Sequence, residues 1–561
     1  MPKSVPLGSS IEVSEPVAAK AAATAPEPPL VPTPRARCGP GAWPETGIQG
    51  RVSREDHEKG LAARGFRCNA ELVGSLTKEP PNLGSVGGYK VLRYVDRKGN
   101  ECAYYDTSLL PPSNAPDLNM GVRVVDMKDP ANPRLATILT TPAMVSPHES
   151  LILNEKRGVL AAVAGNLSQA VLPGIVDLYD ISENCLQPAL RSSTPTGVYG
   201  HESGMAVDGN TFYSASFSTG TIVALDIKNL LAPIPIWFGR YESHGLSLSD
   251  DGNRAYVAKD ANSGTLGLTI LDTTQVQNRT PNPQVPEVSF LTWKGISIPQ
   301  NTVPITIKGR PYVLESDEFG AQVETGGARL IDISDEARPQ VVSNMRLEVM
   351  QPENFDAQAG DPGVDTPFRF AQGYTGHFCN VPTRVDPPIV ACGMAVSGLR
   401  IFDIRDPLRP KEVAYYNAPV KPRTFPEGSN WAYSQPAFAP ERKEVWYSDV
   451  FTGFYAVKLT NGVWPDPKKT PAPARRCISR RVVTVNVRGL GRRSAVRRLT
   501  VFVDGKRTKT QRGSRRRVTV EFTGTRSKRA EVKAVKIVAR LRNGRTVVDR
   551  RRYRLCAPRR R

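Results

Sequence analysis

Four of the five histidines in the sequence occur at one position of a recurring pattern. In each copy an anchor residue is followed, twelve positions later, by an apolar or aromatic residue that opens a short apolar run. The anchors are His148, His201, His244, Gln300, His377, Gln435 and, as the weakest match, Leu92. Residues at one phase of a repeat occupy equivalent places in a fold. We therefore expect these side chains to face one another.

Converging imidazoles suggest metal chemistry. Neutral imidazoles from neighbouring strands can form an N3 or N4 site for zinc or copper, with nitrogen ligands at about 2.0 Å. Gln300 and Gln435 would then orient the ring N–H groups or a bound water. Glu149 and Glu202 each follow a histidine and should point to the opposite face of the strand unless the strand end curls. They are candidate orienting groups or acid–base groups.

Two other interpretations of the histidine ring stay open at this level. A repeat amplified from one ancestral unit copies its histidine whether or not it binds anything, so the ring could hold only backbone groups or water. The ring could also form a channel mouth that binds a protein or small-molecule ligand without a metal. Asp260, Glu315, Asp317 and Glu318 follow apolar runs, and we expect them to be solvated loop residues.

The same repeat predicts the fold. Each copy contains short apolar or alternating runs separated by turn dipeptides such as Asp208-Gly209 and Asp251-Gly252, which indicates antiparallel hairpins. Four short strands repeated seven times, at intervals of about 57 residues, are typical of a seven-bladed β-propeller. The seventh copy lacks a fourth strand, and residues 69–79 have that strand's pattern. We expect this N-terminal segment to complete the last blade and close the ring.

Two segments carry a family resemblance. The stretches GVRVVDMKDPANP from Gly121 and GLRIFDIRDPLRP from Gly398 resemble the LVIVD repeat of bacterial surface propellers. The resemblance covers roughly residues 68–465 and is closest in the first, fifth and sixth copies. It implies a seven-bladed propeller at the cell surface and leaves the molecular function open.

Composition divides the rest of the chain. Residues 1–37 are rich in Pro and Ala, lack the apolar core of a signal peptide, and are predicted to be a disordered tail. We expect an N-terminal extension over 38–67, the propeller over 68–465, a Pro-rich linker over 466–474 and a separate domain over 475–561. The sequence has no window of 18 apolar residues, so no transmembrane segment is predicted.

The eight cysteines form no CxxC motif, which disfavours a zinc-thiolate site. Cys379 and Cys392 fall on the first two strands of one blade, where a cross-strand disulfide is plausible. The other pairings expected from position are Cys38 with Cys68, Cys477 with Cys556 and, as the remainder, Cys102 with Cys185. An even count that partitions by domain favours an oxidising compartment, although buried free thiols are an alternative. If the chain is exported, a signal peptide lies upstream of this start.

Residues 475–561 are strongly basic, with 31 Lys and Arg against 4 Asp and Glu, whereas the rest of the chain holds 44 against 50. Alternating runs joined by Asp504-Gly505 and Asn543-Gly544 turns predict a small β-sandwich. Its pattern resembles the Arg-rich, Ig-like C-terminal modules of secreted actinobacterial proteins. Such a field attracts polyanions, above all anionic cell-wall polymers, unless it serves only for solubility. A nucleic acid is the less favoured partner because no aromatic residues interleave with the arginines.

The sequence thus predicts an all-β protein: a seven-bladed β-propeller followed by a small Ig-like β-sandwich. The favoured function is an exported, envelope-associated binding or scaffold module that its basic domain tethers to anionic polymers. The alternative is a metal-dependent enzyme, either a copper oxidoreductase or a metal-assisted hydrolase or lyase, built on the histidine ring.

Overall fold

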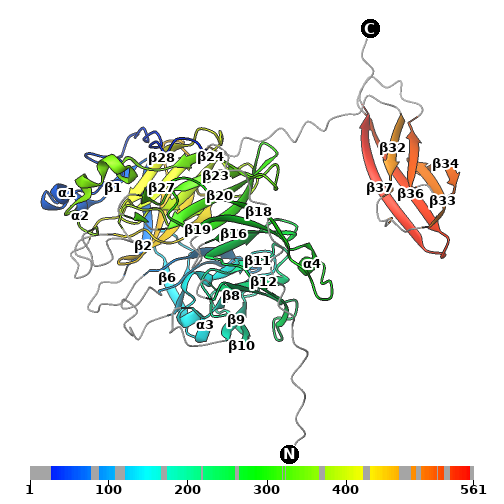
Figure 1. Ribbon diagram of the computed structural model, residues 1–561, viewed down its shortest axis with the longest axis horizontal. Coiled ribbons are helices and arrows are strands. Elements are labelled where there is room, and N and C mark those ends of the chain that lie inside the picture. The colour runs from blue at the N-terminus through cyan, green and yellow to red at the C-terminus, as the bar shows by residue number, and fades with distance from the viewer. Residues whose placement is uncertain are drawn as a thin grey trace, which may run out of the picture. The chain divides into compact units, whose positions relative to one another are not determined.

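The structure is a computed structural model that describes residues 27–77, 87–107, 121–165, 173–216, 219–259, 265–318, 320–321, 324–364, 373–420, 430–465, 482–487, 490, 495–513, 516–522 and 531–555. The chain forms two compact units, Met1–Pro465 and Asp466–Arg561. Both units consist mainly of β-strands (Figure 1). The expected tail before residue 27 and the linker over 466–474 lie outside the described residues.

The described part of the first unit contains seven antiparallel sheets of four or five strands, one for each sequence repeat, and a two-stranded ribbon. The first two sheets are β3 (Val91–Val95), β4 (Glu101–Tyr105), β5 (Val122–Asp126) and β6 (Arg134–Leu139), then β7 (Ile152–Asn154), β8 (Val159–Val163), β9 (Gly174–Asp180) and β10 (Ala189–Gly197). The next two are β11 (Gly204–Met205), β12 (Thr211–Ser216), β13 (Thr221–Asp226) and β14 (Ile234–Arg240), then β15 (Gly245–Leu248), β16 (Arg254–Lys259), β17 (Gly267–Asp272) and β18 (Glu287–Leu291).

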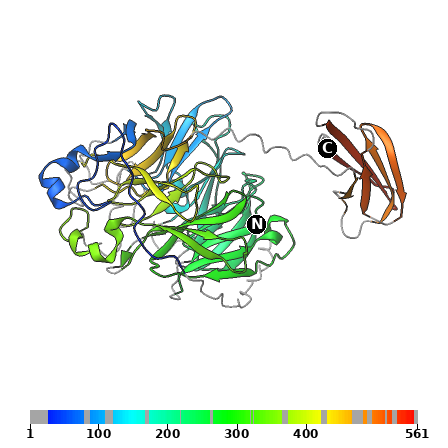
Figure 2. The same cartoon turned by 90° about the horizontal axis from the view of Figure 1, so that it is seen from above.

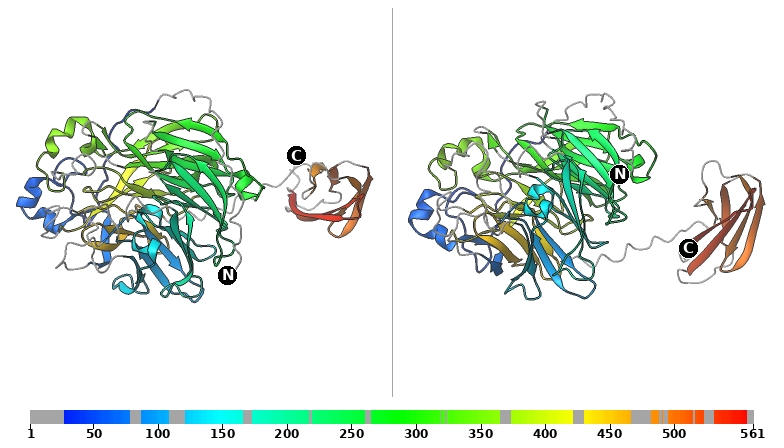
Figure 3. Two further views of the ribbon diagram at one scale, coloured as in Figure 1. Left: turned by 60° about the horizontal axis from the view of Figure 1, so that its bottom comes forward. Right: turned by 90° about the horizontal axis from the view of Figure 1, so that it is seen from below.

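The fifth sheet comprises β19 (Ile298–Ile307), β20 (Arg310–Glu318), β23 (Ala328–Asp332) and β24 (Gln340–Met345), with the ribbon β21 (Gly320–Ala321) and β22 (Glu324–Thr325) between them in sequence. The last two contain β25 (Phe378–Asn380), β26 (Ile389–Gly393), β27 (Leu399–Asp403) and β28 (Lys411–Asn417), then β29 (Ala437–Ala439), β30 (Glu444–Asp449) and β31 (Gly453–Leu459). Figures 2 and 3 show these sheets following one another in chain order through the unit.

Strand composition explains why the sheets pack face to face. Second strands such as β8, β12 and β26 are buried at every position. A strand buried on both faces reads as a continuous run of Val, Ala, Phe and Ile rather than as an alternation. The predicted all-β propeller is confirmed.

Two N-terminal strands join the end of the unit. Strand β2 (Ala70–Leu76) pairs antiparallel with β31, so residues from the start of the chain complete the sheet of β29, β30 and β31. The short strand β1 (Phe66–Cys68) adds to the edge of β28, where Figure 1 shows the two side by side. The last two sheets are therefore fastened by residues that precede the first repeat.

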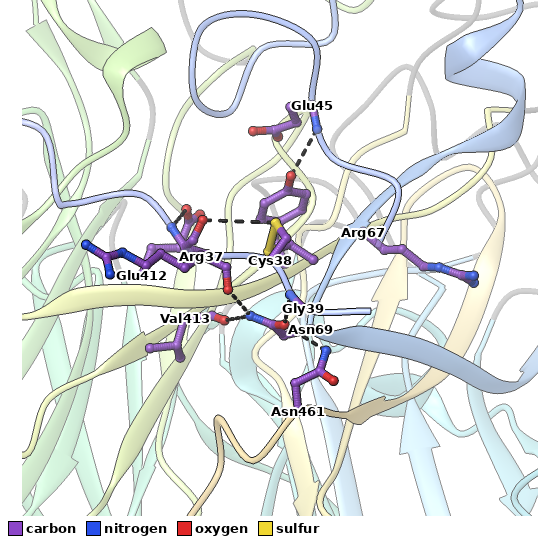
Figure 4. Close-up of a disulfide and its surroundings, with 12 residues drawn as sticks. Arg37, Cys38, Gly39, Glu45, Arg67, Asn69, Glu412, Val413 and Asn461 are labelled. Carbon is purple, nitrogen blue, oxygen red and sulfur yellow. Dashed lines mark hydrogen bonds between the residues drawn. A yellow bond between two sulfur atoms is a disulfide. The ribbon is translucent and has the colours of Figure 1, made fainter. Parts of the chain in front are cut away.

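The extension before β1 is held by polar contacts. The Asn69 amide donates to the carbonyl oxygens of Arg37 and Val413, at 2.9 and 2.8 Å, beside the Cys38–Cys68 disulfide (Figure 4). The backbone N–H of Thr33 donates to the Arg346 carbonyl at 2.8 Å. Residues 27–37 are therefore ordered, and the predicted tail extended too far, because pairing of its backbone with the propeller compensates for its Pro-rich composition.

Three disulfides join described cysteines in the expected pairs: Cys38–Cys68, Cys102–Cys185 and Cys379–Cys392. Cys477 and Cys556 lie outside the described residues.

The helices are short: α1 (Arg54–Glu58), α2 (Leu61–Arg64), α3 (Pro142–Val145), α4 (Thr274–Gln277), η1 (His148–Ser150), η2 (Glu348–Met350), η3 (Pro352–Asn354) and η4 (Asp356–Gln358). In the part of the chain that the structure describes, none has the length and apolar character of a membrane-spanning helix.

The described part of the second unit has two sheets. One pairs β32 (Val482–Asn486) with β35 (Arg517–Glu521), and the other has the order β34 (Lys506–Arg512), β33 (Val496–Val503), β36 (Glu531–Leu541), β37 (Thr546–Leu555). Val485, Val501, Val518 and Ile537 from both sheets share one hydrophobic core. The Ig-like assignment stays a prediction.

Candidate metal centre

The four repeat-phase histidines converge in the first unit. Neighbouring ring centroids are 4.2 Å apart for His148 and His201 and 4.5 Å apart for His201 and His244. Tyr89 continues the circle, at 4.7 Å from His148 and 5.5 Å from His377. Three blades in a row and a fourth farther along the chain therefore contribute imidazoles to one buried cluster, as the shared phase predicted.

Glu149 lies among these imidazoles. One of its carboxylate oxygens, Oε2, lies 3.0 Å from Nε2 of His201 and the other, Oε1, lies 3.3 Å from Nε2 of His377. Glu149 was predicted to face away from the histidines unless the strand end curls, and the end does curl: His148–Ser150 is a 3₁₀ turn and not part of a strand, so Glu149 turns toward them. His148 has a φ of 50° there, a conformation that non-glycine residues rarely adopt and that is concentrated at functional sites.

A second carboxylate completes the cluster. Glu318 places Oε2 3.2 Å from Nε2 of His244 and Oε1 3.3 Å from Nε2 of His377. Glu315, Asp317 and Glu318 are all buried at the end of β20, so the expectation of solvated loop residues is wrong. Asp260 lies outside the described residues. Glu318 could not have been found from the repeat, because no other copy has an acid at its phase.

Backbone carbonyls orient two of the imidazoles. Nδ1 of His244 lies 3.0 Å from the Pro299 carbonyl oxygen, and Nδ1 of His377 lies 2.6 Å from that of Tyr433. A carbonyl only accepts hydrogen bonds, so each Nδ1 carries the proton. In a neutral ring, Nε2 then presents a lone pair toward the carboxylates. Imidazoles that bind metals are commonly held by this kind of outer hydrogen bond.

Burial and neighbouring charges shift the pKa values of the clustered histidines in opposite directions. Burial lowers the pKa of His148 to about 3, with a further contribution from His201. Burial opposes the charged form of His377 as well, but the Glu318 carboxylate raises its pKa to about 9. Burial disfavours ionised Glu149, yet His201 holds its pKa well below the usual value. Burial likewise opposes the charged form of His201, but the Glu149 carboxylate raises its pKa. Without a metal, protons on His201 and His377 therefore offset the charge of the carboxylates.

The predicted glutamines differ in position. The Gln300 side-chain amide donates to Glu149, so this residue orients a carboxylate of the cluster and not an imidazole N–H as predicted. Gln435 instead lines a cavity of about 950 Å³ that runs along the first strands of the blades. Leu92 lines the same cavity, and the first blade contributes Tyr89 to the cluster in its place.

Glu202 belongs to a layer between the cluster and this cavity. It pairs with Lys90 and accepts a hydrogen bond from the Asn301 amide at 3.0 Å, and all three residues line the cavity. Burial raises the pKa of Glu202 to about 7, although Lys90 opposes the shift. A Cβ atom on Gly245 would lie 1.8 Å from a Glu202 oxygen, so the glycine after His244 makes room for this carboxyl group.

Two groups of described side chains have the donor atoms and spacing to hold a metal ion: His148, Glu149 and His201, and Glu149, Glu318 and His377. Within each group the ligand atoms lie within 4.8 Å of one another. The buried Nδ1 of His148 has no hydrogen-bond partner among the described residues, as suits a ligand atom. The donor set mixes nitrogen and oxygen, which differs from the all-nitrogen site that the histidine phase alone predicted.

Known proteins resemble this chain only in fold. No family model matches its sequence, and no curated protein matches it. Solved structures that resemble it include Kuenenia stuttgartiensis hydrazine synthase (13% identity, TM-score 0.43), covering 66% of this chain and 95% of that one. Pseudomonas aeruginosa periplasmic gluconolactonase has 13% identity and a TM-score of 0.42, covering 67% and 95%. The WD40 propeller domain of Doa1 has 9% identity and a TM-score of 0.39, covering 71% and 99%. These proteins are propellers, and their sequence identity to this chain is too low to indicate its function.

Proposed function

We propose that the propeller is a metal-dependent enzyme whose metal ion is bound by His148, Glu149 and His201. The observation that carries this proposal is a cluster of four histidines and two glutamates, all buried except the partly exposed His201, in contact with one another. Burying so many ionisable groups is costly unless a cation is bound. A binding or scaffold module without chemistry has no need of such a cluster, so the sequence-based alternative is favoured over the first prediction.

The ligand types favour zinc and a hydrolase or lyase over a copper oxidoreductase. Copper that cycles through Cu(I) prefers soft sulfur ligands, whereas a set of two imidazoles and one carboxylate suits zinc. A zinc ion with three protein ligands supplies Lewis-acid activation of water or of a carbonyl group. His201 is the most exposed of the six side chains, at 19%, which favours substrate approach from its side.

Each neighbouring residue has a distinct part in this proposal. Gln300 fixes the orientation of the Glu149 carboxylate, and the Pro299 carbonyl fixes the ring of His244. The Lys90–Glu202 pair and Asn301 hold a polar layer between the cluster and the 950 Å³ cavity. The chain thereby keeps its ligand atoms in place before a substrate arrives, which is what catalysis by orientation requires.

Metal analysis tests the proposal. Full-length protein, stripped with a chelator and then dialysed against ZnCl₂, should retain tightly bound zinc. The double variant His148→Ala/His201→Ala should lose it, while Gln435→Ala should keep it. Gln435 is the matched control because it shares the repeat phase but lies outside the cluster. Wild-type protein that retains no zinc, copper or other transition metal would contradict the proposal.

We propose separately that the second unit binds anionic polymers. Pairing between β34, β33 and β36 places Arg512 opposite Arg498, and Arg498 opposite Arg540. Like charges directly opposite one another destabilise a sheet. Arg512, Arg498 and Arg540 thus form a row across three strands that lie about 4.8 Å apart. A row of arginines at this spacing is expected where a bound polyanion relieves the repulsion between their charges.

Binding to purified wall polymer tests this second function. Replacing Arg498, Arg512 and Arg540 together with Gln should weaken binding and reduce its salt dependence. Replacing Arg507, Arg542 and Arg545, which are exposed outside this row, removes the same charge and should have the smaller effect. Equal losses in both variants would show that net charge alone accounts for the binding.

The disulfides between described cysteines further support export to an oxidising compartment, at the cell envelope or outside the cell.

A further inference from the structure

The two carboxylates of the cluster each lie between two histidines. The oxygens of Glu149 face His201 on one side and His377 on the other, and those of Glu318 face His244 and His377. A carboxylate whose two oxygens serve different partners has the arrangement of a bridging ligand. These contacts therefore provide two candidate centres rather than one.

The spacing of the ligand atoms fits metal coordination at both centres. Nitrogen and oxygen ligands that share a zinc ion at about 2.0–2.2 Å lie roughly 3.0–3.5 Å from each other. The pairs His201–Glu149, His377–Glu149 and His377–Glu318 are separated by 3.0, 3.3 and 3.3 Å. Among the described residues these atoms form two three-ligand groups that have only Glu149 in common.

The second centre needs either a proton on His377 or a metal cation. Nδ1 of His377 donates to the Tyr433 carbonyl, so in a neutral ring the lone pair of Nε2 points toward acceptor oxygens of both Glu149 and Glu318, and a cation there would satisfy all three groups. This buried nitrogen makes no aligned hydrogen bond to either oxygen. His244 also places Nδ1 at a carbonyl, that of Pro299, and its Nε2 lies 3.2 Å from Glu318.

We propose that the cluster binds two divalent metal ions, one held by His148, His201 and Glu149 and the other by His377, Glu318 and Glu149, with Glu149 bridging them. His244 is placed to supply a further ligand at the second ion. This inference rests on the proposed metal-dependent function and deepens it. Paired ions clamp both the attacking and the leaving oxygen of a displacement, so a binuclear centre favours the hydrolase over the lyase.

Metal stoichiometry tests the inference on the full-length chain. Chelator-treated protein titrated with ZnCl₂ should bind two ions, and Glu318→Gln should bind one. Gln435→Ala is the control, because Gln435 shares the repeat phase of the histidines but lies outside the cluster; it should still bind two. If Glu318→Gln does not fold by circular dichroism, His377→Gln replaces it with the same expectation.

A spectroscopic measurement on the wild type does not depend on any variant. Protein loaded with MnCl₂ should show an exchange-coupled electron paramagnetic resonance spectrum, because the two ions share a carboxylate. One bound ion per chain with an uncoupled six-line spectrum would overturn the binuclear centre and leave the proposed function standing. No bound ion in either experiment would contradict both.

Discussion

Two clusters of buried charge in the propeller unit are balanced in opposite ways. Around Arg400, the guanidinium donates to Glu45, to Glu412 at 3.0 Å and to the Ser397 carbonyl at 2.7 Å. Around Glu149 and Glu318, the two carboxylates meet the imidazoles of His201, His244 and His377, and no Arg or Lys side chain contacts either carboxylate among the described residues. The first cluster carries its own permanent cation, whereas the second must obtain one from protons or metal. We infer that the first is structural and the second functional.

Removing the permanent cation should have the largest effect on stability. Arg400→Met leaves Glu45 and Glu412 buried without a cation, which should lower the free energy of unfolding by about 3–5 kcal/mol. Because Glu45 belongs to the N-terminal extension, that segment should also become sensitive to proteases. Urea denaturation and limited proteolysis measure the two effects.

The matched control for this variant neutralises the partners as well. Arg400→Met/Glu45→Gln/Glu412→Gln should recover much of the lost stability, because no uncompensated charge stays buried. A single variant as stable as the wild type would show that the Arg400 cluster does not hold the fold together.

Supplying a cation to the second cluster should have the reverse effect. Zinc at a thousand times its dissociation constant should stabilise the folded state by about 4 kcal/mol, since it binds the native site only. Thermal unfolding of chelator-treated protein with and without ZnCl₂ measures this. The His148→Ala/His201→Ala variant should show a much smaller shift, and equal shifts in both proteins would place the binding elsewhere.

A lone buried acid provides a third case. Burial raises the pKa of Asp449 to about 7, although hydrogen bonds from Phe451 and Thr452 oppose the shift. Since the unfolded value is near 3.8, the folded state retains a proton that the unfolded state loses. Stability should therefore fall as the pH rises from about 4 to about 7, by roughly 4 kcal/mol at most. Asp449→Asn should remove this part of the pH dependence of urea unfolding; an unchanged profile would contradict it.

The smallest effect is expected from an orienting residue. Gln300→Leu removes the amide that donates to Glu149 and leaves every proposed ligand in place. Zinc affinity should fall by about 10- to 100-fold, the usual cost of losing an outer-shell partner. Gln435→Leu, with no place in the cluster, should leave the affinity unchanged. Titration against a competing chelator separates the two variants.

The sequence predicted the fold and half of the site for one physical reason. Every copy of a repeat has the same strand order and the same anchor position, so the sequence predicted the seven sheets and the convergence of His148, His201, His244 and His377. Features that occur in only one copy cannot be predicted from the repeat. The 3₁₀ turn that directs Glu149 inward and the single acid Glu318 belong to individual blades, and only the packing of blades against one another brings them together.

Anomalous diffraction from crystals of zinc-loaded protein tests the central claim most directly. Data collected on both sides of the zinc absorption edge should show metal among His148, His201, Glu149, Glu318 and His377, with the nearest nitrogen and oxygen atoms at about 2.0–2.2 Å. A cluster that contains only water, with the carboxylates held by protonated histidines, would contradict the account.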